Sequence, residues 1–177
     1  MGYRVRKATL DDRQAISELI AESARRLSRE HYADAQIESA ITSIFGVDST
    51  LIEDETYFVA EEHGVLIGSG GWSKRKTLFG GDQFSDRDTA RIDPATEPAR
   101  IRAFFVHPDH ARKGVAREIL LACEREAKAH GFGALELMST LPGVKFYEAN
   151  GYSASGDFDL ELPDGVKVQF VPMRKEL

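Results

Sequence analysis

Three basic residues surround a glycine at a point where the chain changes from a strand pattern to a helix pattern. Arg112, Lys113 and Arg117 flank Gly114, and a long amphipathic pattern begins at Val115. The first N–H groups of a helix lack partners within it, and the helix dipole makes that end positive. Glycine allows a close approach because it has no Cβ. This combination predicts a site for a diphosphate, although an ordinary turn with solvated basic side chains fits the local pattern equally well.

A second stretch whose residue types could take part in chemistry lies nearer the end of the chain. Phe146 and Tyr147 are followed by Gly151 and Tyr152. A positioned tyrosine hydroxyl can act as a general acid. A packed aromatic side chain on a short helix is the alternative interpretation of Tyr147.

Strands and helices predicted from the sequence pattern position both stretches. A strand over 100–106 ends before Pro108, because proline cannot continue a hydrogen-bonded ladder. From Val115 to about 130, apolar side chains recur every three or four residues and form one helix face, on which Cys123 is expected to be a buried, inert thiol. A strand over 134–139 and a short helix over 144–149 follow.

The remaining pattern predicts a strand over 3–8, helices over 11–28 and 33–45, strands over 56–61 and 65–73, and a final hairpin of 155–162 with the strand after Gly165. Gly68, Gly70 and Gly71 within a strand predict a bulge or a close approach by backbone or ligand. Residues 74–99 show no period, and a loop of that length is often functional or mobile.

Composition predicts an ordinary globular protein with a single domain over 1–177. Hydrophobic residues make up 42% and charged residues 29%, with a net charge of −6. This acidic balance argues against nonspecific nucleic-acid binding and suits a cationic acceptor. One cysteine excludes an intramolecular disulfide, and the sequence shows neither a secretory segment nor a membrane-length apolar run, so we expect a cytoplasmic protein with no membrane partner.

The two stretches together resemble the GCN5-related N-acetyltransferases. Gly114 and Ala116 match motif A of that family, Gln/Arg-x-x-Gly-x-Gly/Ala, while Ala111 replaces its first residue. Residues 146–152 resemble motif B, an aromatic-Tyr pair followed by glycine and an aromatic residue. The asparagine that often precedes the tyrosine in the family is absent, because 141–143 reads Leu-Pro-Gly.

The resemblance implies an α/β fold of the α+β type. Its central sheet would be mixed and mostly antiparallel, with about seven strands, about four flanking helices and a splay between the fourth and fifth strands. Acetyl-CoA would be the donor, bound in that opening, and no metal is required. The implied cofactor contacts are Phe104, Phe105 and Val106 for the pantetheine arm and acetyl carbonyl, and Arg112, Lys113, Gly114, Val115, Ala116 and Arg117 for the diphosphate.

The implied reaction is direct attack of a primary amine, on a small molecule or a peptide, with Tyr147 as the acid that serves the thiolate. The 74–99 segment would then be an insertion over the acceptor site, or else a disordered surface excursion. The general base stays unassigned among Asp82, Asp86, Asp88, Glu61 and His31.

Two other function classes compete with this one. A non-catalytic acyl-CoA-binding module, acting as a sensor or docking protein, fits the departures from both motifs. A dinucleotide-binding domain is disfavoured because Gly-x-Gly-x-x-Gly is missing. The sequence leaves the assembly state open, with a homodimer as one option.

Overall fold

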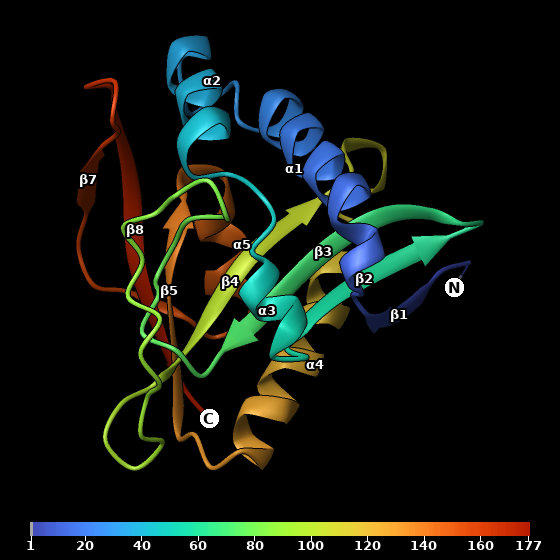
Figure 1. The fold of residues 1–177 in the computed structure, drawn as a ribbon, viewed down its shortest axis with the longest axis vertical. Coiled ribbons are helices and arrows are strands. Elements are labelled where there is room, and N and C mark those ends of the chain that lie inside the picture. Colours follow the sequence, from blue (N-terminus) through green and yellow to red (C-terminus); the bar gives the residue numbers. More distant parts are fainter. Residues whose placement is uncertain (1) are drawn as a thin grey trace.

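A mixed sheet of eight strands runs through the computed structural model, which describes residues 2–177 (Figure 1). The strand order is β1-β2-β3-β4-β5-β8-β6, with β7 also paired to β8, and only β4 and β5 are parallel. The strands are β1 (Arg4–Lys7), β2 (Tyr57–Glu62), β3 (Val65–Ser73), β4 (Ala99–Val106), β5 (Ala134–Thr140), β6 (Ser153–Ala154), β7 (Phe158–Glu161) and β8 (Lys167–Glu176).

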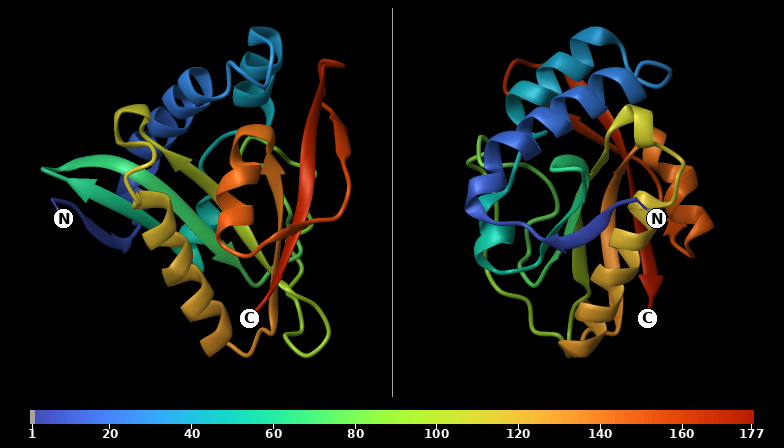
Figure 2. Two further views of the ribbon diagram at one scale, coloured as in Figure 1. Left: turned by 180° about the vertical axis from the view of Figure 1, so that it is seen from behind. Right: turned by 90° about the vertical axis from the view of Figure 1, so that its right-hand side faces the viewer.

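Five α-helices cover the two faces of this sheet. They are α1 (Arg13–Leu27), α2 (Asp34–Ser43), α3 (Ser49–Glu53), α4 (Val115–Ala129) and α5 (Val144–Ala149), and three 3-10 turns lie at Leu10–Asp12, Pro108–His110 and Leu141–Gly143. Helices α1 to α3 lie on one face, and α4 and α5 lie on the other (Figures 1 and 2). No helix among the described residues is long and apolar enough to cross a bilayer.

Separate apolar clusters hold the two helix layers. Between α4 and the sheet, Ile119, Leu120 and Cys123 are fully buried with Trp72 and Leu135. The cysteine is therefore a core residue, as expected. On the other face, one cluster packs α1 and α3 on β2, and another packs α2 on β8. The core thus lies on both sides of β3 and β4, which holds these central strands rigidly.

Most predicted elements are confirmed, and the exceptions are short. Helix α3 was missed because it has only five residues and begins at a cap that the periodicity does not reveal: Asp48 accepts a hydrogen bond from Thr50 N–H. The predicted strand over 155–162 was too long, since β7 is confined to Phe158–Glu161. Phe158 is 40% exposed, because β7 lies at an edge of the sheet.

The glycines of β3 confirm the expected bulge and close approaches. Between Ser69 and Gly71 the pairing shifts, so that β4 carries one extra residue there, and Ala103 adopts φ 54°. A Cβ on Gly70 would lie 2.7 Å from the Phe104 ring, and one on Gly68 would lie 2.6 Å from Val115 Cγ1. Positions 68 and 70 therefore require glycine, because the start of α4 and the Phe104 ring pack directly against the sheet there.

Strands β4 and β5 diverge almost as soon as they meet. They pair only at Ala99–Leu135 and Arg100–Glu136. Beyond this point β5 keeps its full antiparallel pairing with β8, from Ala134 to Thr140. The expected splay between the fourth and fifth strands is thus present, and it opens along the second half of β4.

The segment 74–98 is irregular but firmly attached to the rest of the protein. Apart from a bridge between Arg75 and Arg91 it forms no strand or helix. Arg75 donates two hydrogen bonds to Asp54, at 2.6 and 2.8 Å, and Asp82 accepts a bond from Ser49 N–H at 2.8 Å. These contacts hold the segment against α3, so it is not a disordered excursion.

Asp54→Asn tests this attachment. Hydrogen bonds from Arg75 hold the pKa of Asp54 below its ordinary value. Since the folded pKa is depressed, the pair contributes fully above the unfolded pKa of about 4 and loses its contribution as the pH falls through the lower folded pKa. We expect the variant to lose about 1–2 kcal/mol of unfolding free energy at pH 7, measured by urea denaturation.

The difference between variant and wild type should shrink below about pH 4. Asp157→Asn, at an exposed position, is the matched control and should change little. Equal stability of Asp54→Asn and wild type at pH 7 would contradict the anchoring role.

Candidate active site

The loop before α4 is open toward solvent. Gly114 caps the helix with φ 87° and ψ −2°, and a Cβ placed on it would have no heavy atom within 4 Å. Arg112 also has a positive φ, 61°. Both conformations turn the backbone outward, and Gly114 is exposed. The space before this loop is therefore free for a ligand.

Six consecutive backbone donors at this loop and the first turn of α4 have no hydrogen-bond partner among residues 2–177. Within residues 2–177, no acceptor is hydrogen-bonded to the backbone N–H groups of Arg112 through Arg117; the first bonded donor is Glu118, whose N–H lies 3.1 Å from Gly114 O. Such a row of donors at a helix start is the arrangement that binds phosphate oxygens. The site residues predicted between Arg112 and Arg117 thus coincide with this row of unpaired donors, and their contact with a diphosphate stays a prediction.

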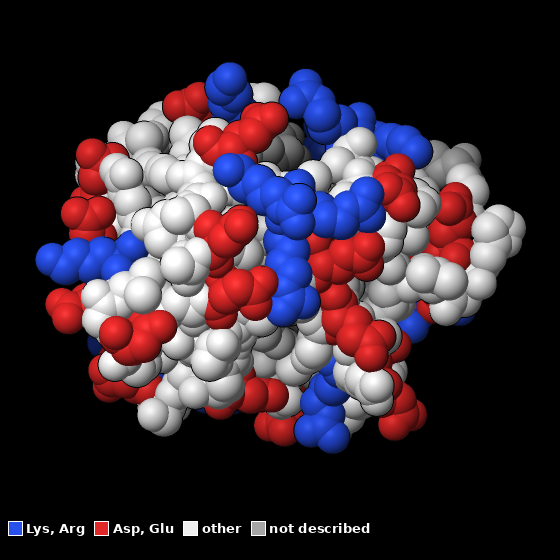
Figure 3. All heavy atoms as spheres, turned by 90° about the horizontal axis from the view of Figure 1, so that it is seen from above, with Lys and Arg blue, Asp and Glu red and all other residues white. Residues whose placement is uncertain are grey.

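Basic side chains add positive charge near the loop. Lys113 is folded back, with Nζ 2.9 Å from Asp109 O. Arg112 and Arg117 are exposed, and neither forms an ion pair with any residue from 2 to 177. On the face at the top of Figure 1, lysine and arginine side chains form a band that is flanked by acidic side chains (Figure 3). The positive charge of Arg112 and Arg117 therefore favours the binding of an anion at this loop, although the net charge of the protein is −6.

Histidines anchor this loop to the rest of the fold. His110 Nε2 lies 3.0 Å from Glu62 Oε2 at the end of β2, and His107 Nε2 lies 3.4 Å from Glu22 Oε2 on α1. Arg26 donates to Asp109 at 2.9 Å. The sequence did not reveal these contacts, because each partner lies far away along the chain.

The open half of β4 begins beside this loop. Ala99 to Arg102 are buried, whereas Ala103 to Val106 are half-buried. His107 N–H bonds to Ile67 O on β3, and the direction of backbone groups alternates along an antiparallel ladder. The N–H and C=O of Val106 consequently point away from β3, toward the opening. Phe104, Phe105 and Val106 all border that opening, as predicted; their contact with a ligand stays a prediction.

Tyr147 lies on the α5 side of the opening. Its ring meets Phe104 at a centroid distance of 6.3 Å, Phe146 at 5.0 Å and Tyr152 at 5.6 Å. The side chain is only 7% exposed, and its hydroxyl forms no hydrogen bond with a described residue. Burial raises the pKa of Tyr147, so the hydroxyl is protonated at neutral pH. It is a proton donor without an internal acceptor.

A polar network that the sequence did not indicate connects α4 with the end of α5. Tyr152 Oη donates to Glu124 Oε1 at 3.1 Å, and Lys175 Nζ donates to the same oxygen at 2.9 Å. Burial and the Glu124 carboxylate raise the pKa of Tyr152. Tyr152 is thereby fixed as a structural partner of Tyr147, while the hydroxyl of Tyr147 stays available.

Most general-base candidates are engaged in structural contacts. Glu61 binds Arg4 and Arg6 at the β1 edge, and Asp82 accepts hydrogen bonds from the backbone N–H and the hydroxyl of Ser49 at the start of α3. Asp88 accepts a bond from Ala90 N–H. His31 and Asp86 are exposed. The arrangement thus assigns the base to none of the five.

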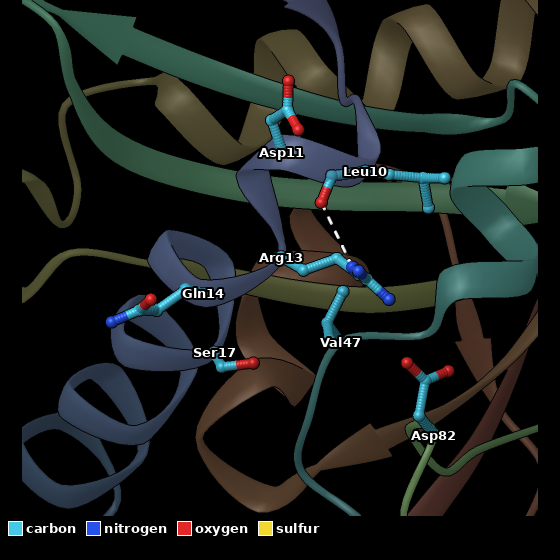
Figure 4. A pocket seen from close by; sticks show the side chains of 7 residues that line it. All are labelled: Leu10, Asp11, Arg13, Gln14, Ser17, Val47 and Asp82. Carbon is cyan, nitrogen blue, oxygen red and sulfur yellow. Dashed lines mark hydrogen bonds between the residues drawn. The ribbon is translucent and has the colours of Figure 1, made fainter.

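A separate hollow lies at the start of α1. It has a volume of about 550 Å³ and is shallow, and Leu10, Asp11, Arg13, Gln14, Ser17, Val47 and Asp82 line it at the start of α1 (Figure 4). The hydrogen bond drawn between two of these residues runs from Arg13 Nε to Leu10 O, at 3.1 Å. No group of His, Cys, Asp and Glu within residues 2–177 could hold a metal ion.

A family model described as the acetyltransferase (GNAT) family matches residues 14–152, and the chain belongs to this family. The match contains the whole opening, from the loop before α4 to Tyr152. The family that the two sequence motifs suggested is confirmed. No curated protein sequence matches the chain.

Solved structures share the fold over the whole chain. A GCN5-related N-acetyltransferase from Rhodopseudomonas palustris is 19% identical, with a TM-score of 0.74 over 100% of this chain and 97% of that one. PaiA N-acetyltransferase from Thermoplasma acidophilum, in complex with coenzyme A, is 17% identical, with a TM-score of 0.67 and complete coverage of both chains. YncA from Salmonella typhimurium, with acetyl-CoA, is 16% identical, with a TM-score of 0.64 over 100% and 95%.

Gly114→Ala tests the loop as a diphosphate site. Alanine at positive φ costs about 1 kcal/mol, and relief of that strain would rotate the neighbouring N–H groups. We expect the Kd of acetyl-CoA to rise about tenfold or more by calorimetry, equivalent to about 1.4 kcal/mol.

Gly165→Ala is the matched control, because Gly165 has φ 84° and equally open surroundings in the β7–β8 turn. It should lose similar stability without weaker binding. Unchanged acetyl-CoA affinity in both variants would show that the loop does not hold the cofactor.

Proposed function

We propose that the protein is an N-acetyltransferase that moves an acetyl group from acetyl-CoA to a primary amine of a small molecule or peptide by direct attack. The observation that carries this proposal is the row of six unpaired backbone donors at Gly114 beside the opening between β4 and β5. Two structures with the same fold contain coenzyme A or acetyl-CoA, which supports the choice of ligand.

The residues present suit such a donor. The N–H groups and the free side chains of Arg112 and Arg117 would hold the diphosphate, and the unpaired backbone of β4 would hold the pantetheine arm. Bound acetyl-CoA supplies an activated acyl carbon. An N–H on the open side of β4 can then stabilise negative charge on the carbonyl oxygen.

Two protons must move during transfer. An alkylammonium has a pKa near ~10.4, so the acceptor must lose a proton before it attacks. At the other end, the Tyr147 hydroxyl would serve the departing sulfur. Its raised pKa keeps the proton in place until negative charge develops on the sulfur, and the hydrogen bond then stabilises that charge.

The direct test is release of free thiol from acetyl-CoA in the presence of a panel of primary amines, with calorimetry of acetyl-CoA binding alongside. Thiol release that depends on the amine supports the enzyme. Tight binding without turnover by any amine would instead identify a non-catalytic acyl-CoA-binding module. The absence of binding would contradict both functions.

Tyr147→Phe isolates the acid role, because it removes one oxygen and keeps the ring contacts with Phe104 and Phe146. We expect kcat to fall at least about 100-fold, with the Kd of acetyl-CoA within about threefold of wild type. The measurement is steady-state thiol release together with calorimetry.

Tyr152→Phe is the control for loss of a hydroxyl in the same cluster. It should cost about 1–2 kcal/mol of stability, because Glu124 loses a donor, with little change in kcat. Wild-type kcat in Tyr147→Phe would refute the acid role.

A further inference from the structure

Six phenylalanine rings form a continuous run on the face of the sheet that carries α1, α2 and α3. We call this set the aromatic run. Its ring contacts are Phe105–Phe45 at 5.5 Å, Phe45–Phe170 at 6.4 Å, Phe170–Phe79 at 6.4 Å, Phe79–Phe84 at 5.5 Å and Phe79–Phe158 at 6.4 Å. These rings come from α2's end, the 74–98 segment, β4, β7 and β8.

The run begins at the proposed reaction site. Successive residues of a strand face opposite sides of a sheet. Phe104 accordingly packs toward Tyr147 and the α4 layer, while Phe105 packs toward Phe45 and the α1 layer. No strand pairs with this part of β4 on the side that faces β5, so the proposal places the attack on the acyl carbon from the Phe105 side.

Hydrogen bonds fix the 74–98 segment in place where it contributes Phe79 and Phe84 to the aromatic run. Gly81 N–H donates to Ile44 O at 2.9 Å, and Asp82 N–H donates to Val47 O at 2.8 Å. A Cβ on Gly81 would lie 2.7 Å from the backbone of Gly46. This close crossing of two glycines places Phe79 and Phe45, one on each segment, along one surface.

The charged side chains beside this crossing are paired: Asp48 contacts both Arg102 and Arg87, and Arg87 Nη2 also lies 3.9 Å from Asp82 Oδ1. Arg102 is 3% exposed and donates to Asp48 at 3.1 Å and to Gly80 O at 2.8 Å. Arg87 Nη1 also lies 2.7 Å from Asp48 Oδ1. Both guanidinium groups thus share the Asp48 carboxylate and hold the segment that carries Phe79. The aromatic run beside them presents an apolar surface.

The rings are not fully covered by the protein. Phe45, Phe79, Phe84 and Phe105 are half-buried, and Phe158 is 40% exposed at the far end. Apolar area that is still in contact with water is stabilised when a ligand covers it. A run that leads from the acyl site to the surface is suited to the body of the second substrate.

We infer that the acceptor is an amine attached to an aromatic or large aliphatic group, which packs on the aromatic run while the nitrogen reaches the opening beside Phe105. This inference rests on the proposed acetyltransferase function and assigns its substrate class. The 74–98 segment then acts as a specificity-determining wall through Phe79.

The test compares phenylalaninamide with serinamide, two α-amines that differ chiefly in the side group, in the thiol-release assay. The wild-type enzyme should prefer phenylalaninamide by at least about tenfold in kcat/KM. Phe79→Ala should reduce that preference to about threefold or less, with the Kd of acetyl-CoA from calorimetry unchanged.

Phe158→Ser provides a second test in case Phe79→Ala fails to fold, because Phe158 is exposed and belongs to the same run. It should also lower the preference for phenylalaninamide. Val65→Ser is the matched control, since Val65 is 60% exposed on β3, away from the run, and should leave the preference unchanged. Equal use of both amides, or preference for serinamide, would overturn the substrate class while leaving the acetyltransferase intact. Binding of acetyl-CoA without thiol release from any amine would overturn both.

Discussion

The divergence of β5 from β4 is the constraint on which the rest of the structure depends. Parallel pairing ends at Arg100–Glu136, where Arg100 Nη1 and Glu136 Oε1 lie 2.6 Å apart. Past that ion pair, β5 satisfies its backbone groups with β8 and β4 satisfies its own with β3, so the sides that face each other have no strand partner. Unpaired backbone groups require a partner, and a ligand or water must supply it.

Glycine and helix placement turn this gap into a site. The missing Cβ of Gly68 lets Val115, the first residue of α4, settle on β3. The start of α4 therefore lies close to the sheet, and Gly114 turns the preceding loop outward. On the other side, α5 carries Tyr147 to the Phe104 ring. Donors for an anion and a protonated hydroxyl are thus held by the same rigid core.

Local sequence signals predicted much of this arrangement. The apolar period of α4, the glycines of β3 and the proline after β4 report on short-range sterics, which act within a few residues. Helix α5 was predicted at its observed bounds for the same reason. The basic residues around Gly114 at a helix start suggested a diphosphate site, and the resemblance to the family implied the acid role of Tyr147; both roles stay predictions.

Features made by distant residues could not be predicted in this way. The contact between His110 and Glu62, the Tyr152–Glu124–Lys175 network and the aromatic run each join elements far apart in sequence. The segment 74–98 lacks periodicity because its order comes from Asp54, Asp48 and Ser49 outside it. Contacts of this kind can be identified only from the folded structure, because the partners lie far apart in the sequence.

A crystal structure of the protein with acetyl-CoA is the most direct measurement of the central claim. The account predicts diphosphate oxygens within hydrogen-bonding distance of the backbone N–H groups between Arg112 and Arg117. It also predicts the thioester between β4 and β5, with its sulfur beside the Tyr147 hydroxyl. A cofactor bound elsewhere, for example in the hollow at the start of α1, with the β4–β5 opening filled only by water, would contradict it.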